Sequence, residues 1–197
     1  MLFRSLAKYY RIRPGCAGPP LARKIRLWIF NFELHCVACY RFGQYVNNIY
    51  SRSRLLGFIP VGVHRILNFF VRLIHHVDID AATIGPGLFI GHVGTIYIGE
   101  TVIGSNFSLS HNVTIGLGHS EAQKGVPLIG DDVWIGTGSV ISGKITIGNR
   151  VAISNGCMLS RSVPDGCLVA GNPGRIAFRD YDNSKLLDWK YDDEATS

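Results

Sequence analysis

Hydrophobic residues recur every six positions through the second half of this 197-residue chain. The runs at this step are Ile129, Ile135, Ile141, Ile147, Ile153 and Leu159, then Ile103, Leu109 and Ile115, and finally Ile84, Ile90 and Ile96. Neither the helical period of about 3.6 nor the strand alternation of about two produces this step. A six-residue repeat that turns a corner each time does produce it, and three such sides close a prism of stacked parallel strands. The pattern therefore predicts a parallel β-helix.

Two irregularities interrupt the repeat. The register slips by one residue between Ile96 and Ile103, and the step from Ile115 to Ile129 is fourteen residues. The second irregularity predicts that residues 116–127 leave the wall as an extruded loop, which is a common place for function. We expect three regions: an α-helical region over 1–77, a β-helix domain over 78–177, and an acidic tail over 178–197 with a short helix around 185–189.

The N-terminal region has helical patterns separated by breakers. Residues 21 to about 50 predict one helix, residues 51–54 a connection, and residues from about 63 to 75 a second helix that starts after Pro60 and Gly62. Arg65 and Arg72 interrupt the most apolar stretch, so we expect no bilayer-spanning segment. The first residues are too basic and too broken for a signal peptide, which favours a cytoplasmic protein.

Charge is distributed unevenly along the chain. The net charge of +6 is the sum of +11 over residues 1–77, where Glu33 is the only acidic residue, and −5 over the remainder. This asymmetry suggests an anionic partner for the N-terminal region. Nucleic acid is disfavoured because no reading helix or aromatic-basic sheet motif is present. Two interpretations stay open: a helical cap on the prism, or a cap that also contacts the inner face of the membrane. The second is suggested by aromatic residues among the cations, namely Trp28, Phe30, Phe32, Phe58, Phe69 and Phe70.

We expect no disulfide framework from the five cysteines, because the chain shows no secretion signal. Cys36 and Cys39 have the spacing of metal ligands, but no second pair completes a zinc site, and small buried thiols are the commoner outcome on a helix. Cys157 falls on an inward position of the repeat. We therefore expect no metal.

Polar residues that interrupt the repeat are the candidates for chemistry. His92 and His111 each follow an inward residue by two positions and are nineteen residues apart, which is about one turn of the prism. They should lie near one vertical line on the outer wall, and His119 lies in the extruded loop. Histidine suits proton abstraction near neutrality, and a carboxylate such as Asp78 or Asp80 from the preceding coil can orient it. The pattern favours a general base that activates an acceptor.

Residues 78–177 resemble the serine acetyltransferase-like branch of the hexapeptide-repeat acyltransferases. The resemblance is carried by the segments Val77-Asp-Ile-Asp, Ile84-Gly-Pro-Gly-Leu-Phe-Ile-Gly-His92, Ile98-Gly-Glu-Thr101, Ser110-His-Asn-Val-Thr-Ile-Gly116 and Val169-Ala-Gly-Asn-Pro-Gly-Arg175. It implies a left-handed β-helix, acetyl-CoA as co-substrate, and sites between the subunits of a homotrimer, alone or in paired trimers.

The resemblance also implies roles for individual residues. His92 matches the general base and Asp78 its acidic partner, with Asp80 left open because the chain is one residue shorter there. Thr137 and Asn155 match wall positions along which CoA lies, although both also suit ordinary corners, and Arg175 is placed to meet a phosphate. His111 and His119 are candidates for acceptor contacts.

Two departures from the family bear on the acceptor. Serine acetyltransferases carry Asp before the catalytic histidine and an Arg-His pair before the proline after the loop, whereas this chain has Gly91 and Gly125-Val126. Losing the partners of an amino-acid zwitterion is costly in a desolvated site. The leading hypothesis is therefore O-acetylation of a sugar hydroxyl of a surface polysaccharide or its lipid-linked precursor.

Three alternatives are weighed against the sugar hypothesis. The first is serine O-acetylation, with Lys124 replacing a lost partner. The second is a metal lyase that binds zinc through His92, His111 and His119. The third is a non-catalytic scaffold, which would bind no acetyl-CoA.

Overall fold

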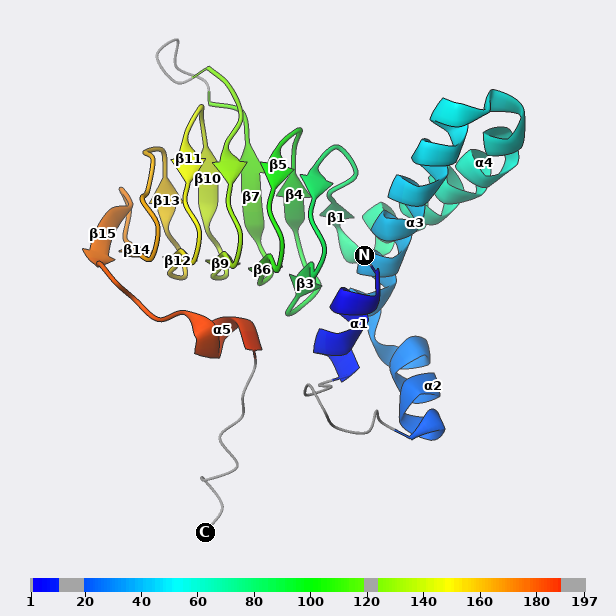
Figure 1. Ribbon diagram of the computed structural model, residues 1–197, viewed down its shortest axis with the longest axis horizontal. Coiled ribbons are helices and arrows are strands. Elements are labelled where there is room, and N and C mark those ends of the chain that lie inside the picture. Colours follow the sequence, from blue (N-terminus) through cyan, green and yellow to red (C-terminus); the bar gives the residue numbers. More distant parts are fainter. Residues whose placement is uncertain (1, 11–19, 119–123, 189–197) are drawn as a thin grey trace.

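The structure is a computed structural model that describes residues 2–10, 20–118 and 124–188. Its short strands form three sheets that are the sides of a prism (Figure 1). The β1 sheet contains β1 (Val77–Asp78), β4 (Ile96–Ile98), β7 (Val113–Gly116), β10 (Val140–Ser142) and β13 (Met158–Leu159). The β2 sheet contains β2 (Thr83–Ile84), β5 (Val102–Ile103), β8 (Leu128–Ile129) and β11 (Thr146–Ile147). The β3 sheet contains β3 (Phe89–Ile90), β6 (Ser108–Leu109), β9 (Trp134–Ile135), β12 (Ala152–Ile153), β14 (Leu168–Ala170) and β15 (Arg175–Phe178).

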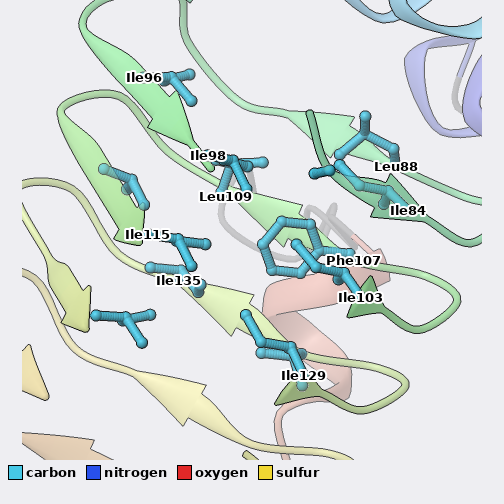
Figure 2. Packing of buried hydrophobic residues seen from close by; sticks show 14 of the residues in the cluster. Ile84, Leu88, Ile96, Ile98, Ile103, Phe107, Leu109, Ile115, Ile129 and Ile135 are labelled. Atoms are coloured by element: carbon cyan, nitrogen blue, oxygen red, sulfur yellow. The ribbon is translucent and has the colours of Figure 1, made fainter. Parts of the chain in front are cut away.

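Every strand pair in the prism is parallel except β14 with β15, which closes the last coil as an antiparallel pair. The register places the six-step aliphatics directly above one another, for example Ile90 opposite Leu109 and Leu109 opposite Ile135. Leu109 and Ile135 point into the prism in Figure 2. Ile90 and Ile135 are fully buried. Burying one such side chain contributes about 1.5–3 kcal/mol relative to leaving it exposed. The predicted parallel β-helix with an N-terminal helical region is confirmed.

In its described residues the helical region contains four α-helices, and a short fifth helix follows the prism. Their bounds are α1 (Leu2–Tyr10), α2 (Leu21–Phe30), α3 (Phe32–Arg52), α4 (Arg54–Phe70), which continues as the π-helix η1 (Val71–His75), and α5 (Ser184–Asp188). The single helix expected over 21–50 is in fact two helices, because Asn31 is extended and its Oδ1 accepts a bond from the Leu34 N–H at 2.7 Å. The second expected helix begins earlier than predicted, at Arg54, and runs through Pro60 and Gly62.

Side chains from α1 and α3 cover the open end of the first coil. The Tyr9 hydroxyl accepts from the Ile90 N–H and donates to the Ile90 carbonyl. The Tyr40 hydroxyl accepts from the Ile84 N–H at 2.9 Å and donates to the Ala82 carbonyl at 2.8 Å. These bonds replace those that a preceding strand would make, and burial raises the pKa of both phenols. The helices therefore terminate the solenoid.

The α3–α4 hairpin projects from this end of the prism (Figure 1). Within the described residues, the continuous stretch Arg54–His75 is long and apolar enough, by length and composition, to cross a membrane. A core helix of a soluble protein can have the same length and composition, but only 11% of an 18-residue apolar window in this stretch is buried. This finding differs from the expectation that Arg65 and Arg72 interrupt the stretch too strongly.

The cysteines in the described residues are buried. Cys36 and Cys39 lie on α3, and burial raises the pKa of Cys36 to about 12 and that of Cys39 to about 11. A thiol with so high a pKa is a poor metal ligand at neutral pH, because metals bind the thiolate. Cys157 is fully buried, as its inward position predicts.

Candidate active site

The turns that lead from the β3 sheet to the β1 sheet stack into one edge of the prism, which we call the histidine edge. In successive coils these turns comprise residues 91–95, 110–112, 136–139 and 154–157, and residues 171–174 lie at the same end of the last strand, β14. Backbone bonds join neighbouring turns: the Gly138 N–H donates to the His111 carbonyl, and the Gly156 N–H donates to the Thr137 carbonyl. The edge is therefore a rigid ladder on which exposed side chains keep a fixed spacing.

His92 and His111 are neighbours on this edge. Their ring centroids are 6.0 Å apart and the rings meet edge to face. The His92 side chain is exposed and His111 is half-buried, with Ser110 Oγ at 3.4 Å from His111 Nδ1. An exposed imidazole on a rigid turn can accept a proton from a hydroxyl that approaches from solvent. The vertical alignment inferred from their nineteen-residue separation agrees with this geometry.

The next steps along the histidine edge are polar. Thr137 donates its hydroxyl to the His111 carbonyl at 2.9 Å, and Asn155 Oδ1 accepts from the Thr137 N–H at 3.0 Å. The Asn155 side chain is exposed, and this bond uses only its oxygen, so its amide NH₂ group can donate to another partner. Arg175 begins β15 directly after residues 171–174, and its guanidinium is exposed except for one 3.4 Å bond to the Gly174 carbonyl. The amide and the guanidinium are donors suited to the amides and phosphates of a CoA-like molecule.

The carboxylates expected beside His92 have other partners. Asp78 forms an ion pair with Arg72 at 2.9 Å. Asp80 lies 3.5 Å from His64 Nε2 and accepts from Asn68 at 3.3 Å. Neither carboxylate contacts His92 among the described residues. Both therefore face the helical hairpin in this chain, and the orienting role of Asp78 stays a prediction.

Glu33 is an acidic residue near the site that the sequence did not single out. Its Oε1 accepts from the Val93 N–H at 3.4 Å, which places a carboxylate beside the turn that carries His92. Glu33 lies in the first turn of α3, far from His92 in sequence. The sequence feature that could have pointed to Glu33 is that it is the only acidic residue among the first 77.

The extruded loop leaves from a different edge. Its described ends lie between β7 and β8, where the chain passes from the β1 sheet to the β2 sheet, and the Gly118 N–H closes the base by donating to the Gly125 carbonyl at 3.1 Å. The histidine edge lies at the other end of the same β1-sheet strands, so within one chain the base of the loop and the histidines are on different edges of the prism. His119 lies outside the described residues.

A prism edge is convex, so one chain offers little enclosure around His92. A hollow of about 460 Å³ lies instead at the neighbouring edge, where Lys8 and Asp131 are among its lining residues. No group of three metal-ligating side chains occurs in the parts of the chain that are described. Enclosure of His92 would require a second surface.

Comparisons with known proteins agree with this geometry. Residues 127–161 match the family described as bacterial transferase hexapeptide (six repeats). The serine acetyltransferase of Bacillus subtilis (strain 168) is 34% identical over 161 residues, which cover 80% of this chain and 70% of that protein. The serine acetyltransferase of Synechococcus elongatus is 37% identical over 123 residues, but the match spans only 50% of that protein.

A solved structure of a relative in complex with a ligand shares the fold. The crystal structure of serine acetyltransferase in complex with coenzyme A from Brucella abortus strain S19 aligns with a TM-score of 0.67 and 27% identity, over 90% of this chain and 66% of that one. The prism with its histidine edge thus defines a hexapeptide-repeat transferase. With its relatives taken into account, the chain belongs to the hexapeptide-repeat acyltransferase family, and the curated relatives above are serine acetyltransferases.

Proposed function

We propose that this protein is an O-acetyltransferase that uses acetyl-CoA as donor. The observation that carries the proposal is the continuous histidine edge, which presents an exposed imidazole, His92, above a polar ladder of Thr137 and Asn155. Family membership and the coenzyme A complex of a relative support the same chemistry. The matches leave out part of each relative, so the activity itself is our inference.

The reaction assigns one task to each group. His92 takes the proton of the acceptor hydroxyl while its oxygen attacks the thioester carbonyl, and backbone N–H groups stabilise the resulting oxyanion. The intermediate collapses by breaking the C–S bond, and the imidazolium returns its proton to the departing thiolate. The products are the acetyl ester and free coenzyme A. Asp78, or Asp80 in its place, would orient the imidazole once released from its helical partner.

The relatives favour L-serine as the acceptor, because those that match over most of their length are serine acetyltransferases. A sugar hydroxyl is the second candidate, and a specific observation favours it. Gly91 offers no side chain next to His92, and Val126 precedes Pro127, so the charged partners of an amino acid are missing from these positions. Lys124 is the charged residue closest to them in the described part of the loop. A neutral acceptor needs no such partners.

The test compares His92→Ala with Lys185→Ala, which alters an exposed side chain on α5, beside a different edge of the prism. Free thiol released from acetyl-CoA is measured with L-serine and, separately, with nucleotide-linked and lipid-linked sugars. We expect His92→Ala to lower turnover by about 10²–10⁴-fold, while coenzyme A binding by calorimetry and the circular dichroism spectrum stay unchanged. Unimpaired turnover would exclude His92 as the base. The acceptor that saturates the enzyme at physiological concentration decides between serine and sugar.

A further inference from the structure

Helix α4 has its large apolar side chains on the outside. The residues buried against α3 are Gly57 and His64, and Val61 and Asn68 on the same face are half-buried. The exposed apolar residues of α4 and η1 are Leu55, Leu56, Phe58, Ile59, Val63, Ile66, Leu67, Phe69, Phe70, Leu73 and Ile74. We call this set the outer face. A helix at a water-exposed surface has the reverse arrangement, so the outer face indicates a non-aqueous neighbour.

The face of α4 that packs on α3, which we call the inner face, is already closely packed. A rotation of the helix therefore cannot bury the outer face. A Cβ on Gly43 of α3 would overlap the His64 imidazole, and one on Gly57 would overlap Tyr50, so the two backbones approach as closely as glycine allows. Asn68 donates to Asp80 from the same side. Small residues at the contact and polar residues between helices are also the packing style of helices in lipid.

Helix α2 extends the same apolar surface. A groove of about 490 Å³ between the helices is lined by Trp28 from α2, Phe42 from α3, and Phe70 and Ile74 from α4 and η1, among others. Next to it on α2, Ile29 and Phe30 are 56% and 69% exposed. The exposed apolar surface thus continues from one helix to the other.

The positive charge of the helices favours an anionic partner. Residues 20–75 contain eight Lys or Arg and one acidic residue, Glu33. Arg54 and Arg65 are exposed at the beginning and in the middle of the outer face. A second copy of this chain would bring the same positive charge and be repelled, whereas an anionic lipid surface is attracted by about 1 kcal/mol per basic residue close to it.

We propose that the outer face, together with the exposed side of α2, docks in the plane of an anionic lipid bilayer and leaves the prism in water. Arg65 favours this orientation over a transmembrane one, because a helix lying in the interface keeps its guanidinium among the headgroups. This docking would hold the histidine edge near the membrane surface. It does not depend on the proposed acetyl transfer.

The test is sedimentation of the purified full chain with vesicles of phosphatidylglycerol and phosphatidylcholine, or of phosphatidylcholine alone. Phe58→Ser removes a side chain that is 74% exposed on the outer face, and Phe178→Ser removes one that is 63% exposed on β15 as a matched control. We expect binding to the anionic vesicles that weakens with salt. Phe58→Ser lowers the partition coefficient about tenfold, and Phe178→Ser leaves it unchanged. Arg54→Gln lowers it about fivefold on anionic vesicles only.

Three results would overturn the proposal. The first is absence of binding to anionic vesicles at low salt. The second is an oligomer that Phe58→Ser dissociates while the vesicles stay unbound, because a second copy then covers the outer face. The third is resistance of the bound protein to alkaline carbonate extraction, which indicates a spanning helix. Thiol release by Phe58→Ser with a soluble acceptor is measured in parallel and stays normal, which keeps this test separate from that of the proposed function.

Discussion

The Tyr40 hydroxyl is a single group whose removal tests how the helices terminate the prism. Its ring is 2% exposed, and the hydroxyl bonds the Ile84 N–H, the Ala82 carbonyl and the Gln44 side chain. Tyr40→Phe keeps the ring but leaves one backbone donor and one acceptor without partners. Each such buried group costs about 1–3 kcal/mol, so we expect a loss of about 2–4 kcal/mol in the free energy of unfolding.

Urea unfolding followed by circular dichroism measures this loss. A change of this size lowers the unfolding midpoint by about 1–2 M urea. Tyr45→Phe is the matched control, because Tyr45 lies on the same helix and is 65% exposed; its expected change is within about 0.5 kcal/mol. Amide hydrogen exchange at Ile84 should also accelerate in Tyr40→Phe. Equal midpoints for the two variants would refute the view that this hydroxyl replaces a missing strand.

Two further predictions concern the thiols and the oligomer. Burial raises the pKa of Cys36 to about 12, against about 8.5 in an unfolded chain, so the stability due to this thiol is complete below about pH 8.5 and is lost as the pH rises towards 12. Urea midpoints at rising pH should fall, and less steeply in Cys36→Val. Mixing His92→Ala chains with chains lacking residues 119–123 should restore up to about a quarter of the activity if each site combines His92 of one copy with the loop of the next. If each of the two variants is inactive alone and their mixture is inactive too, that result would contradict such shared sites.

The interior of the prism was predictable because each coil needs the same residue types at the same positions: an aliphatic side chain that points inward and a small residue where coils approach closely. A Cβ on Gly104 would lie 2.7 Å from the carbonyl carbon of Gly130 in the next coil, which explains why glycine follows the inward isoleucine there. Ile103 and Ile129 are correspondingly stacked in register. Local sequence alone therefore specifies which residues point inward and where the chain turns.

The helical region was less predictable because tertiary contacts override local signals. Pro60 and Gly62 suggested a break, yet α4 passes through both, since the close approach of Gly57 to Tyr50 fixes the start of the helix on α3. Asn31 is a residue type that favours helix caps, but it lies within a longer apolar pattern that predicts one continuous helix. The inverted faces of α4 could not be inferred from composition, because a buried helix has the same composition.

The candidate site was partly predictable for the same reason. The nineteen-residue spacing placed His92 and His111 on one edge because the repeat sets the length of a coil, whereas the partners of Asp78 and Asp80 come from α4 and η1, which no repeat governs. The repeat also places the two ends of each β1-sheet strand on different edges, so His92 and the base of the loop are separated by the width of a sheet within one chain. A convex edge gains an enclosing wall when a second convex surface lies against it. In the proposed acetyl transfer, a neighbouring copy at the histidine edge would supply this enclosure, and the proposed membrane docking uses a separate surface, the α4 outer face at the end of the prism.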